Sequence, residues 1–533
     1  MPVNESLNAS ADTPRRTADA VPKDAAAVIL VRESAASREP QVFWARRGEH
    51  LAFLGGFHAF PGGQRDAEDS ETTVENCADA EEAAMIACAA RELFEELGVL
   101  VARGAEHLTK GQLASVLDDL TSARMNFPQL LAHYGLRLDA RDFNYAGRWV
   151  TPPFSPRRFD TWFFLARCPL KQEPRVLTTE FESGEWTSPT DAARRWEACD
   201  ALVAPPVLHA LKVLSDGLTE DMSERFLGVP QARRQPVRRI EFMPGFICFP
   251  LRTPTKPPAT HTNCYIVGHS ELVILDPGSP DTDEQAALAA CIDELLTEGR
   301  RVREIILTHH HPDHVAGVDA LRQHLGKHPG GRVPVAAHKL TADALRQHPG
   351  GRVSIDRFIE DGEEIKLSGT PALTLLAMHT PGHTRGHLSF YEARTGALIT
   401  GDNIVGLGSV LIDPPEGNML DYLASLERYR ELLPNVKVLF GGHGAAVASP
   451  RAKIEEYIAH RLERERNILQ ALRAGASSPQ EIVRRVYTDV SPKAHAMAER
   501  AVLAHLEKLE AENLIAQTSD GNFTAYEGSA AAG

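Results

Sequence analysis

One short segment constrains the fold of this chain more than any other: the apolar run Ile305–Leu307, followed by the letters THHHPDH. The run predicts a buried strand, and four histidines and an aspartate follow where that strand ends. Three later residues, His383, Asp402 and His443, also stand just past predicted strands, beside Gly or Pro. Strand ends share an edge in a layered α/β fold, so these distant segments can meet at one place.

These segments offer a large set of imidazole and carboxylate groups, the ligands that Zn²⁺ prefers in proteins. The predicted ligands are His309, His311, Asp313, His314, His383, Asp402 and His443. They exceed what one tetrahedral ion needs and therefore predict two Zn²⁺ ions. We expect His309, His311 and His383 on one ion, Asp313, His314 and His443 on the other, and Asp402 as a bridge.

Two ions about 3.5–4 Å apart would share a hydroxide, because together they lower the pKa of water from about 15.7 toward about 7. Asp313 is expected to help orient this nucleophile as well as to bind metal. The other histidines are expected to do less. His310, His379 and His387 are predicted to support the site or pack in nearby loops, and His324, His328, His338 and His348 to be surface or satisfied core residues.

The pattern T-H-x-H-x-D-H, followed by single His, Asp and His positions, resembles the metallo-β-lactamase superfamily. The resemblance implies an αββα sandwich and a binuclear zinc hydrolase. The segments GDNIVGLGSV, LFGGHG and RLERERNIL are similar to a narrower group, the lactamase-beta-like hydrolases, which include an animal mitochondrial single-strand endoribonuclease. This likeness spans about residues 238–526 and implies a winged-helix-like C-terminal unit.

A second cluster of charged residues lies in the N-terminal part of the chain. Glu92, Glu95 and Glu96 stand at i, i+3 and i+4 and therefore share one face of a helix predicted to begin near Ala80. Like charges at this spacing repel one another unless a cation lies among them. A hard ion, Mg²⁺ or Mn²⁺, suits such oxygen ligands. We expect Arg91 to orient the carboxylates.

Together with Gly62 and Gly63, the segment RELFEELGV resembles the Nudix box, a diphosphate-cleaving motif. The resemblance implies an α/β/α sandwich and assigns Gly62 and Gly63 to cofactor binding. Two features depart from the motif: the gap from Gly63 to Arg91 is long, and Ala83, next to Glu82, occupies the place of an expected glutamate. The run LGGFHAFPGGQRD looks like the CoA-cleaving branch of the family.

Three interpretations of this cluster remain open: an active Nudix site, a Nudix fold with weakened or lost activity, and an acidic solvated helix face. Glu182 and Glu185 are candidates for a distal acid that completes an active site. Gly98 is predicted to end the helix that carries the three glutamates.

The chain of 533 residues is therefore predicted to be an α/β multidomain protein. The expected divisions are a flexible tail at 1–23, a Nudix-like domain at 24–228, a linker and lead-in strand at 229–258, a metallo-β-lactamase-fold domain at 259–449, and a helix with a winged-helix-like domain at 450–528. All five tryptophans lie before residue 200, in the first domain.

Composition narrows the possible partners and the compartment. The net charge is −15, and residues 477–526 carry five basic against seven acidic side chains, the wrong sign for a phosphate-binding module. No apolar stretch is long enough to span a membrane, so no membrane partner is expected. Seven dispersed cysteines without a CxxC pair favour reduced thiols and a cytoplasmic location. The sequence specifies no oligomeric state.

Three functions remain open for the C-terminal hydrolase. The first is cleavage of phosphodiesters in single-stranded RNA or of a related ester. The second is hydrolysis of acyl-CoA or another thioester, as in glyoxalase II, together with a CoA-processing Nudix domain. The third is a non-catalytic scaffold, which a full set of metal ligands disfavours. For the Nudix-like domain, the expected substrate is a small nucleotide or CoA-type molecule.

Overall fold

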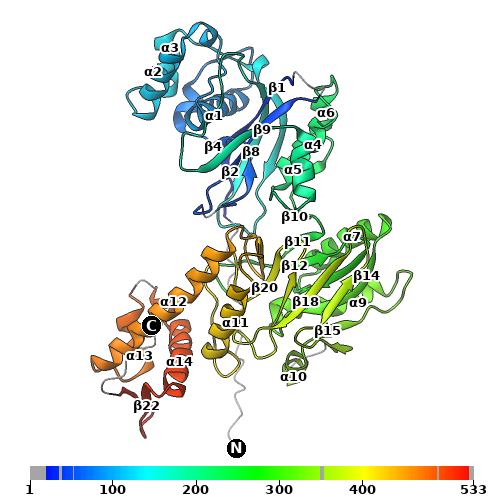
Figure 1. Ribbon diagram of the computed structural model, residues 1–533, viewed down its shortest axis with the longest axis vertical. Coiled ribbons are helices and arrows are strands. Elements are labelled where there is room, and N and C mark those ends of the chain that lie inside the picture. The colour runs from blue at the N-terminus through cyan, green and yellow to red at the C-terminus, as the bar shows by residue number, and fades with distance from the viewer. Residues whose placement is uncertain (1–19, 35–38, 52, 348–352, 489–490, 527–533) are drawn as a thin grey trace, which may run out of the picture.

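The computed structural model describes residues 20–34, 39–51, 53–347, 353–488 and 491–526, which form three units (Figure 1). The N-terminal unit lies above the central unit in this view, and the C-terminal unit lies beside the central one. Most of the expected flexible tail, residues 1–23, lies outside the described residues. The last two residues of the expected C-terminal domain, 527 and 528, also lie outside them.

The N-terminal unit is built on a seven-stranded mixed sheet in the order β3-β2-β1-β8-β7, with β4 beside β1 and β9 beside β2. Its strands are β1 (Lys23–Arg32), β2 (Gln41–Arg47), β3 (His58–Ala59), β4 (Gly62–Gln64), β7 (Asn144–Val150), β8 (Phe159–Arg167) and β9 (Phe181–Thr187). Its helices are α1 (Ala80–Leu97), α2 (Lys110–Thr121), α3 (Phe127–Tyr134), α4 (Pro189–Glu197), α5 (Pro205–Leu214) and α6 (Met222–Phe226). A small separate pair joins β5 (Val74–Glu75) to β6 (Leu138–Asp139).

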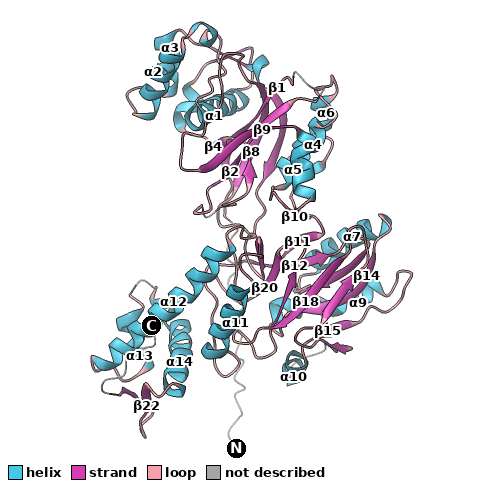
Figure 2. Ribbon diagram, viewed as in Figure 1, coloured by secondary structure: helices cyan, strands magenta, loops and turns pink. Residues whose placement is uncertain are grey.

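Strand β1 shows why this unit has three layers. Its alternate residues bury opposite faces of the sheet: Val28 and Leu30 pack in the core beneath α1, whereas Ile29 and Val31 pack in the core on the other face. A strand buried on both faces needs helices on both sides, and α1–α3 and α4–α6 provide them (Figure 2). The expected α/β/α sandwich is confirmed.

Helix α1 carries the glutamate cluster and has well-defined ends. It begins after Asp79, whose side chain accepts a hydrogen bond from the backbone N–H of Glu82. It ends at Gly98, whose left-handed φ of 68° suits a glycine C-cap, as predicted. The long gap between Gly63 and α1 contains the 3₁₀ helix η1 (Ala67–Glu71) and strand β5.

The central unit contains two facing sheets. The seven-stranded sheet has the order β10-β11-β12-β13-β14-β15-β16, and the five-stranded sheet the order β17-β18-β19-β20-β21. The strands are β10 (Ile240–Met243), β11 (Phe246–Arg252), β12 (His261–Val267), β13 (Glu271–Leu275), β14 (Arg301–Leu307), β15 (Val335–Ala337), β16 (Arg357–Phe358), β17 (Glu364–Leu367), β18 (Leu373–His379), β19 (Leu388–Glu392), β20 (Ala397–Gly401) and β21 (Val438–Gly441). The helices are α7 (Thr282–Thr297), α8 (Pro312–Val315), α9 (Val318–Leu325), α10 (Lys339–Gln347) and α11 (Met419–Glu431).

Apolar side chains divide the central unit into layers. Ile306 and Phe390 lie in the core between the sheets, whereas Ile305 and Leu307 face the outer layer formed by α7 and α9. Leu398 and Leu439 face the opposite outer layer with α11. This is the αββα arrangement that the resemblance implied. In the parts of the chain that the structure describes, no helix combines the length and the apolar character needed to cross a membrane.

Residues 229–258, expected as a linker with one lead-in strand, instead supply two strands, β10 and β11, to the edge of the seven-stranded sheet. The two units also share one buried apolar cluster. The rings of Phe57 and Phe242 meet edge to face at 5.3 Å, and the indole N–H of Trp196 donates to the carbonyl of Phe242. The segment is structured because its strands pair in the sheet and bury apolar side chains, Phe242 in the cluster shared by the two units and Phe249 in the outer layer of the central unit.

The C-terminal unit consists of α12 (Pro450–Arg473), α13 (Pro479–Val486), α14 (His495–Ala511) and a hairpin of β22 (Ile515–Gln517) and β23 (Phe523–Ala525). The two strands pair antiparallel, and the turn between them contains Asp520-Gly521, a dipeptide typical of hairpin turns. Arg500 of α14 hydrogen-bonds Asp413 and the carbonyl of Pro414 in the central unit. These contacts hold α14 beside the loops of the central unit.

Candidate functional site

Four loops meet at one edge of the two central sheets. The segment His309–His314 follows β14, His383 lies in the turn after β18, Asp402 follows β20, and His443 follows β21. The turn at Gly382 requires a glycine, since φ is 134° and a Cβ would lie 2.2 Å from the Cα of Tyr422. The structure brings together all seven residues predicted from the strand ends.

Three of these histidines form a compact triad. The Nδ1 atom of His311 lies 3.0 Å from Nε2 of His309 and 3.0 Å from Nε2 of His383. The remaining nitrogens of the two flanking rings point away, because His309 Nδ1 contacts Thr308 Oγ1 and His383 Nδ1 donates to the carbonyl of Leu411. Three ring nitrogens therefore face one point, an arrangement that could hold a metal ion.

A second triad, Asp313, His314 and His443, lies beside the first. Asp313 Oδ2 is 3.8 Å from His314 Nε2 and 3.6 Å from His443 Nε2. Asp402 stands between the triads: its Oδ1 is 3.4 Å from His314 Nε2, and its Oδ2 is 3.2 Å from His443 Nε2 and 3.7 Å from His383 Nε2.

Two buried polar atoms at the centre have no hydrogen-bond partner, His314 Nε2 and Asp402 Oδ1. Buried polar groups nearly always find partners, and those that lack one often mark a missing ion. The donor chemistry and these two atoms fit divalent cations. Gly442 permits the close approach, since a Cβ there would lie only 2.1 Å from Asp402 Oδ1.

Asp276 is a residue that the sequence analysis missed. It follows β13 and accepts hydrogen bonds from the backbone N–H of Thr308 at 2.8 Å, from Thr308 Oγ1 at 2.6 Å and from His314 Nδ1 at 2.9 Å. A carboxylate on Nδ1 fixes the tautomer of His314 and aims the lone pair of Nε2 into the site. The position of Asp276 just after a predicted strand was the feature of the sequence that could have identified it.

Other groups orient the remaining side chains. The carbonyl of His261 accepts from His443 Nδ1, and Thr262 donates to Asp313 Oδ2 at 3.2 Å. The backbone N–H of Asp402 donates to His387 Nε2 at 3.2 Å, so His387 supports the site without facing the triads. The loop geometry therefore depends on residues from several strands.

Electrostatics distinguish the two triads. Burial, together with neighbouring imidazoles, lowers the pKa of His309 and His311 well below the usual value, which keeps these rings neutral. Burial also disfavours the charged form of His314, but Asp402, Asp313 and Asp276 raise its pKa well above the usual value. The second triad therefore attracts positive charge more strongly than the first.

The triads open into a cleft of about 440 Å³. Its walls come from the loop Pro254–Ala259, from residues 405–416 and from Met497 of α14. Lys256 is the one lysine among the described residues that line it, and those residues include no Phe, Tyr or Trp. The C-terminal unit thus contributes to the wall of the cleft.

The N-terminal unit holds the glutamate cluster around Arg91. Arg91 donates to Glu92 at 2.9 Å and to Glu95 at 3.1 Å, as the prediction that it orients carboxylates requires. It also forms a two-pronged pair with Asp69, both bonds being 2.9 Å, and Asp69 is fully buried. Asp69 belongs to η1, so the long insertion of the Nudix-like motif holds Arg91 in place.

The two predicted glycines contact the carboxylates directly. The backbone N–H of Gly62 donates to Glu96 at 2.8 Å, and a Cβ on Gly63 would lie 2.5 Å from the carboxyl carbon of Glu92. Burial raises the pKa of Glu92 to about 7, and it raises the pKa of Glu95 and Glu96 as well. A cation among the three groups would oppose this shift, which fits a metal site.

The candidates for a distal acid lie in other contacts. Glu182 pairs with Arg46, and Glu185 pairs with Arg195 at 2.5 Å. Besides burial and the charge of Glu92, Glu180 also raises the pKa of Glu96; it directly precedes β9 and lies 3.9 Å from Arg47. Sequence distance gave no reason to choose among these three glutamates, because each of them contacts a residue of β2, which lies far away in the chain.

Comparison with known proteins places the chain in a family. The family model described as the metallo-beta-lactamase superfamily matches residues 257–443. The Beta-lactamase-like protein 2 homolog of Drosophila melanogaster is 30% identical over 284 residues, which cover 50% of this chain and 88% of the relative. The chain belongs to the metallo-β-lactamase superfamily. Residues 70–214 match the NUDT19 Nudix domain, and 478–524 match the beta-lactamase associated winged helix domain.

Two further proteins show the range of relatives. Atrochrysone carboxyl ACP thioesterase dmxR1 from Cryptosporiopsis sp. (strain 8999) is 30% identical over 253 residues, covering 47% of this chain and 70% of that protein. The crystal structure of a NUDIX hydrolase from Alicyclobacillus acidocaldarius is 30% identical, with a TM-score of 0.33, and covers 38% of this chain and 96% of that one.

These matches confirm the family resemblance and the three-part fold predicted from sequence. Both large domains belong to hydrolase families that generally use divalent metals. The chain is a metal-dependent hydrolase of the metallo-β-lactamase superfamily, fused to a Nudix domain.

Proposed function

We propose that the metallo-β-lactamase domain holds two Zn²⁺ ions and hydrolyses an ester of an acyl carrier, most simply a thioester. The observation that supports the two-ion site is the pair of adjacent triads with Asp402 between them. When bound, the two ions would supply an activated water and neutralise the negative charge that develops on the scissile bond. The proposed ligands are the seven residues at the strand ends.

The protein's own residues prepare the site for this chemistry. Asp313, held by Thr262, lines the cleft together with other predicted ligands, where it can orient a water molecule against the substrate. Asp276 and the carbonyls of Leu411 and His261 hold three imidazoles with one nitrogen facing inward. Little reorganisation is then needed when substrate binds, which is a main source of catalytic power in such sites.

The cleft favours a small acyl substrate over RNA. Single-stranded nucleic acid is usually held by a positively charged groove with aromatic side chains that stack on the bases. The described lining offers one lysine, Lys256, and apolar residues such as Pro258, Val410 and Leu411. The acyl-carrier thioesterase among the relatives also supports a thioester. Cleavage of single-stranded RNA is the competing hypothesis, which the likeness to the endoribonuclease group suggested.

The test is a substrate screen with the full-length protein reloaded with Zn²⁺. We expect acyl-CoA or acyl-pantetheine to release a free thiol, and His311→Ala to abolish this release because it removes the central ligand of the first triad. The matched control is His133→Gln, on helix α3 of the other domain. Zinc-dependent cutting of short RNA without thiol release would refute the thioester proposal. Wild-type thiol release by His311→Ala would refute the site.

For the Nudix domain we propose cleavage of a diphosphate in a nucleotide or CoA-type substrate, with Mg²⁺ or Mn²⁺ held by Glu92, Glu95 and Glu96. Burial raises the pKa of all three carboxyl groups, even though Arg91 pairs with Glu92 and Glu95, and a divalent cation among them would favour their charged forms. Glu95→Gln is expected to remove diphosphate cleavage and leave thiol release intact. Unchanged release of phosphate-containing products would refute the proposed site.

A further inference from the structure

A third group of metal-binding side chains lies away from both sites, on the outer layer of the metallo-β-lactamase domain. Asp293 projects from α7, His324 from α9, and His328 from the turn just after α9. Sequence analysis expected both histidines to be ordinary surface or core residues. His324 lies in the last turn of α9, the chain turns after Leu325 so that His328 lies beside it, and the fold brings Asp293 of α7 to both rings.

The three side chains converge on one point. His324 Nε2 lies 2.7 Å and His328 Nε2 lies 3.1 Å from the same carboxylate oxygen, Asp293 Oδ1. The two Nε2 atoms are 3.4 Å apart. All three side chains are between 26% and 42% exposed, so an ion from solvent can reach them.

This spacing agrees with metal coordination. Zinc–nitrogen bonds of about 2.0–2.1 Å at a tetrahedral angle place two nitrogen ligands about 3.3–3.4 Å apart. The two histidine nitrogens already have this separation. In the catalytic triad the corresponding ring nitrogens are 3.0 Å apart, so the outer group needs no larger adjustment than the inner one.

The chemistry of the three groups suits a cation. A neutral imidazole that carries its proton on Nδ1 presents a lone pair at Nε2, and a carboxylate presents negative charge on its oxygens. In both histidines, Nε2 is the atom that lies nearest the other two groups, so the ring nitrogens that would bind an ion already face Asp293.

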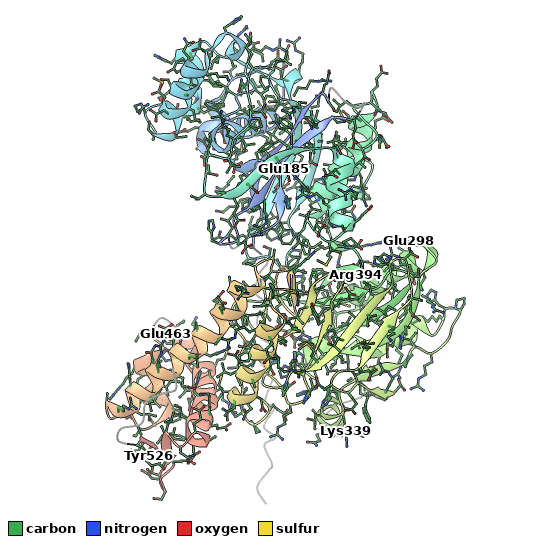
Figure 3. All side chains as sticks on the ribbon, viewed as in Figure 1. Glu185, Glu298, Lys339, Arg394, Glu463 and Tyr526 are labelled. Carbon is green, nitrogen blue, oxygen red and sulfur yellow. The ribbon has the colours of Figure 1, made fainter. Side chains whose placement is uncertain are left out.

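We propose that Asp293, His324 and His328 bind a divalent transition-metal ion, with water completing its coordination, at a site separate from the two hydrolytic centres. Two imidazoles and one carboxylate suit Zn²⁺, Ni²⁺ or Cu²⁺ and do not suit Ca²⁺ or Mg²⁺, which prefer oxygen ligands. The ion joins α7 to the end of α9. Figure 3 labels Glu298, just past α7, on the side of this domain that faces away from the C-terminal unit.

An ion that binds the folded state and not the unfolded one stabilises the folded state by RT ln(1 + L/Kd), where L is the free ion concentration and Kd the dissociation constant. The first measurement is therefore the zinc content of the full-length protein after chelation, reloading and dialysis. The double variant His324→Gln/His328→Gln is expected to retain one equivalent less than the wild type. This difference in zinc content does not depend on how many ions the catalytic centre holds. The outer site can therefore be refuted while the proposed function stands, and the proposed function can be refuted while the outer site stands.

The second measurement is the melting temperature with and without added Zn²⁺. Zinc is expected to raise the melting temperature of the wild type more than that of the double variant. The control is His107→Gln, which replaces an exposed histidine beside Glu106. This variant is expected to bind as many equivalents of zinc as the wild type. Equal zinc content and equal zinc-induced shifts in wild type and double variant would overturn the proposal.

If the double variant does not fold, His328→Gln alone replaces it, because His328 lies beyond the last residue of α9. It removes one of three ligands, and we expect at least a tenfold loss of zinc affinity at this site. Wild-type affinity in the single variant would equally overturn the proposal.

Discussion

Replacing Asp276 with asparagine tests whether the catalytic centre depends on the residue behind His314. Asp276 has a left-handed φ of 52°, which asparagine tolerates, so the backbone is not strained by the change. The substitution keeps one oxygen for Thr308 but replaces the other with an N–H₂ group. That group would face His314 Nδ1, which then has to give up its proton and carry it on Nε2 instead.

A proton on His314 Nε2 blocks the lone pair that faces the second triad. Loss of such a supporting contact typically weakens metal binding 10–100-fold, or about 1.4–2.7 kcal/mol. We expect the affinity for one of the two zinc ions to fall by this factor, as measured by competition with a chromophoric chelator. Asp356→Asn is the control, since Asp356 accepts from the backbone N–H of Val335 and pairs with arginines but contacts no histidine of the site. Wild-type affinity for both equivalents in Asp276→Asn would refute this reasoning.

Three other substitutions test the site, the interface and a buried histidine. Gly442→Ala would displace Asp402 and is expected to remove at least one equivalent of bound zinc. The control Gly111→Ala, which has open space around it, should remove none. Full zinc content in Gly442→Ala would contradict the close approach of Gly442 to Asp402. Phe57→Ala removes a fully buried interdomain ring and is expected to cost about 3–5 kcal/mol. Tryptophan fluorescence and zinc release should then shift together in urea, and an unshifted zinc-release curve would argue against a shared core. Burial lowers the pKa of His58 to about 4, so its neutral form favours folding above pH 6.5 and this stability is lost as the pH falls from 6.5 to 4. Between pH 7 and pH 5 the loss is about 2 kcal/mol, and urea unfolding of His58→Gln should show a correspondingly smaller loss than the wild type.

The shared core changes how the two hydrolase domains are to be understood. A flexible linker would let each domain fold and move alone. Here β10 and β11 belong to the metallo-β-lactamase sheet, while Phe242 of β10 packs against Phe57 and Trp196 of the Nudix domain. Lys437 also donates to Asp200 across the junction at 3.1 Å. The fixed arrangement predicts that the domains unfold together.

Much of the catalytic site could be predicted from the sequence because its ligands follow strands. Position in the sequence predicts these ligands, because they follow apolar runs and stand beside glycine or proline. This holds for the residues after Leu307 and for His383, Asp402 and His443. The same reasoning located the glutamates of α1, whose spacing puts them on one helix face. Each of these signals is local, because the residues next to each ligand are enough to predict it.

Other parts of the site depend on contacts between distant segments. Asp276 matters only because β13 lies beside β14, which places its carboxylate against Thr308 and His314. Asp69 matters because the insertion folds back onto Arg91. Glu180 lies beside Arg47 because β9, which directly follows it, pairs with β2. Sequence spacing carries no information about such pairings.

The sequence by itself therefore determined the families, the layered architecture and the side chains that could bind metal. The side chains that could bind metal follow from residue types at strand ends and from helical spacing, which are properties of neighbouring residues, whereas the families and their layered folds are what the resemblance of the motifs implied. Only the tertiary structure decided which nitrogen of each ring faces inward, that two strands, β10 and β11, lie within the segment expected as a linker with one strand, and that Asp293 meets His324 and His328. Each of these depends on the packing of elements that are far apart in the chain.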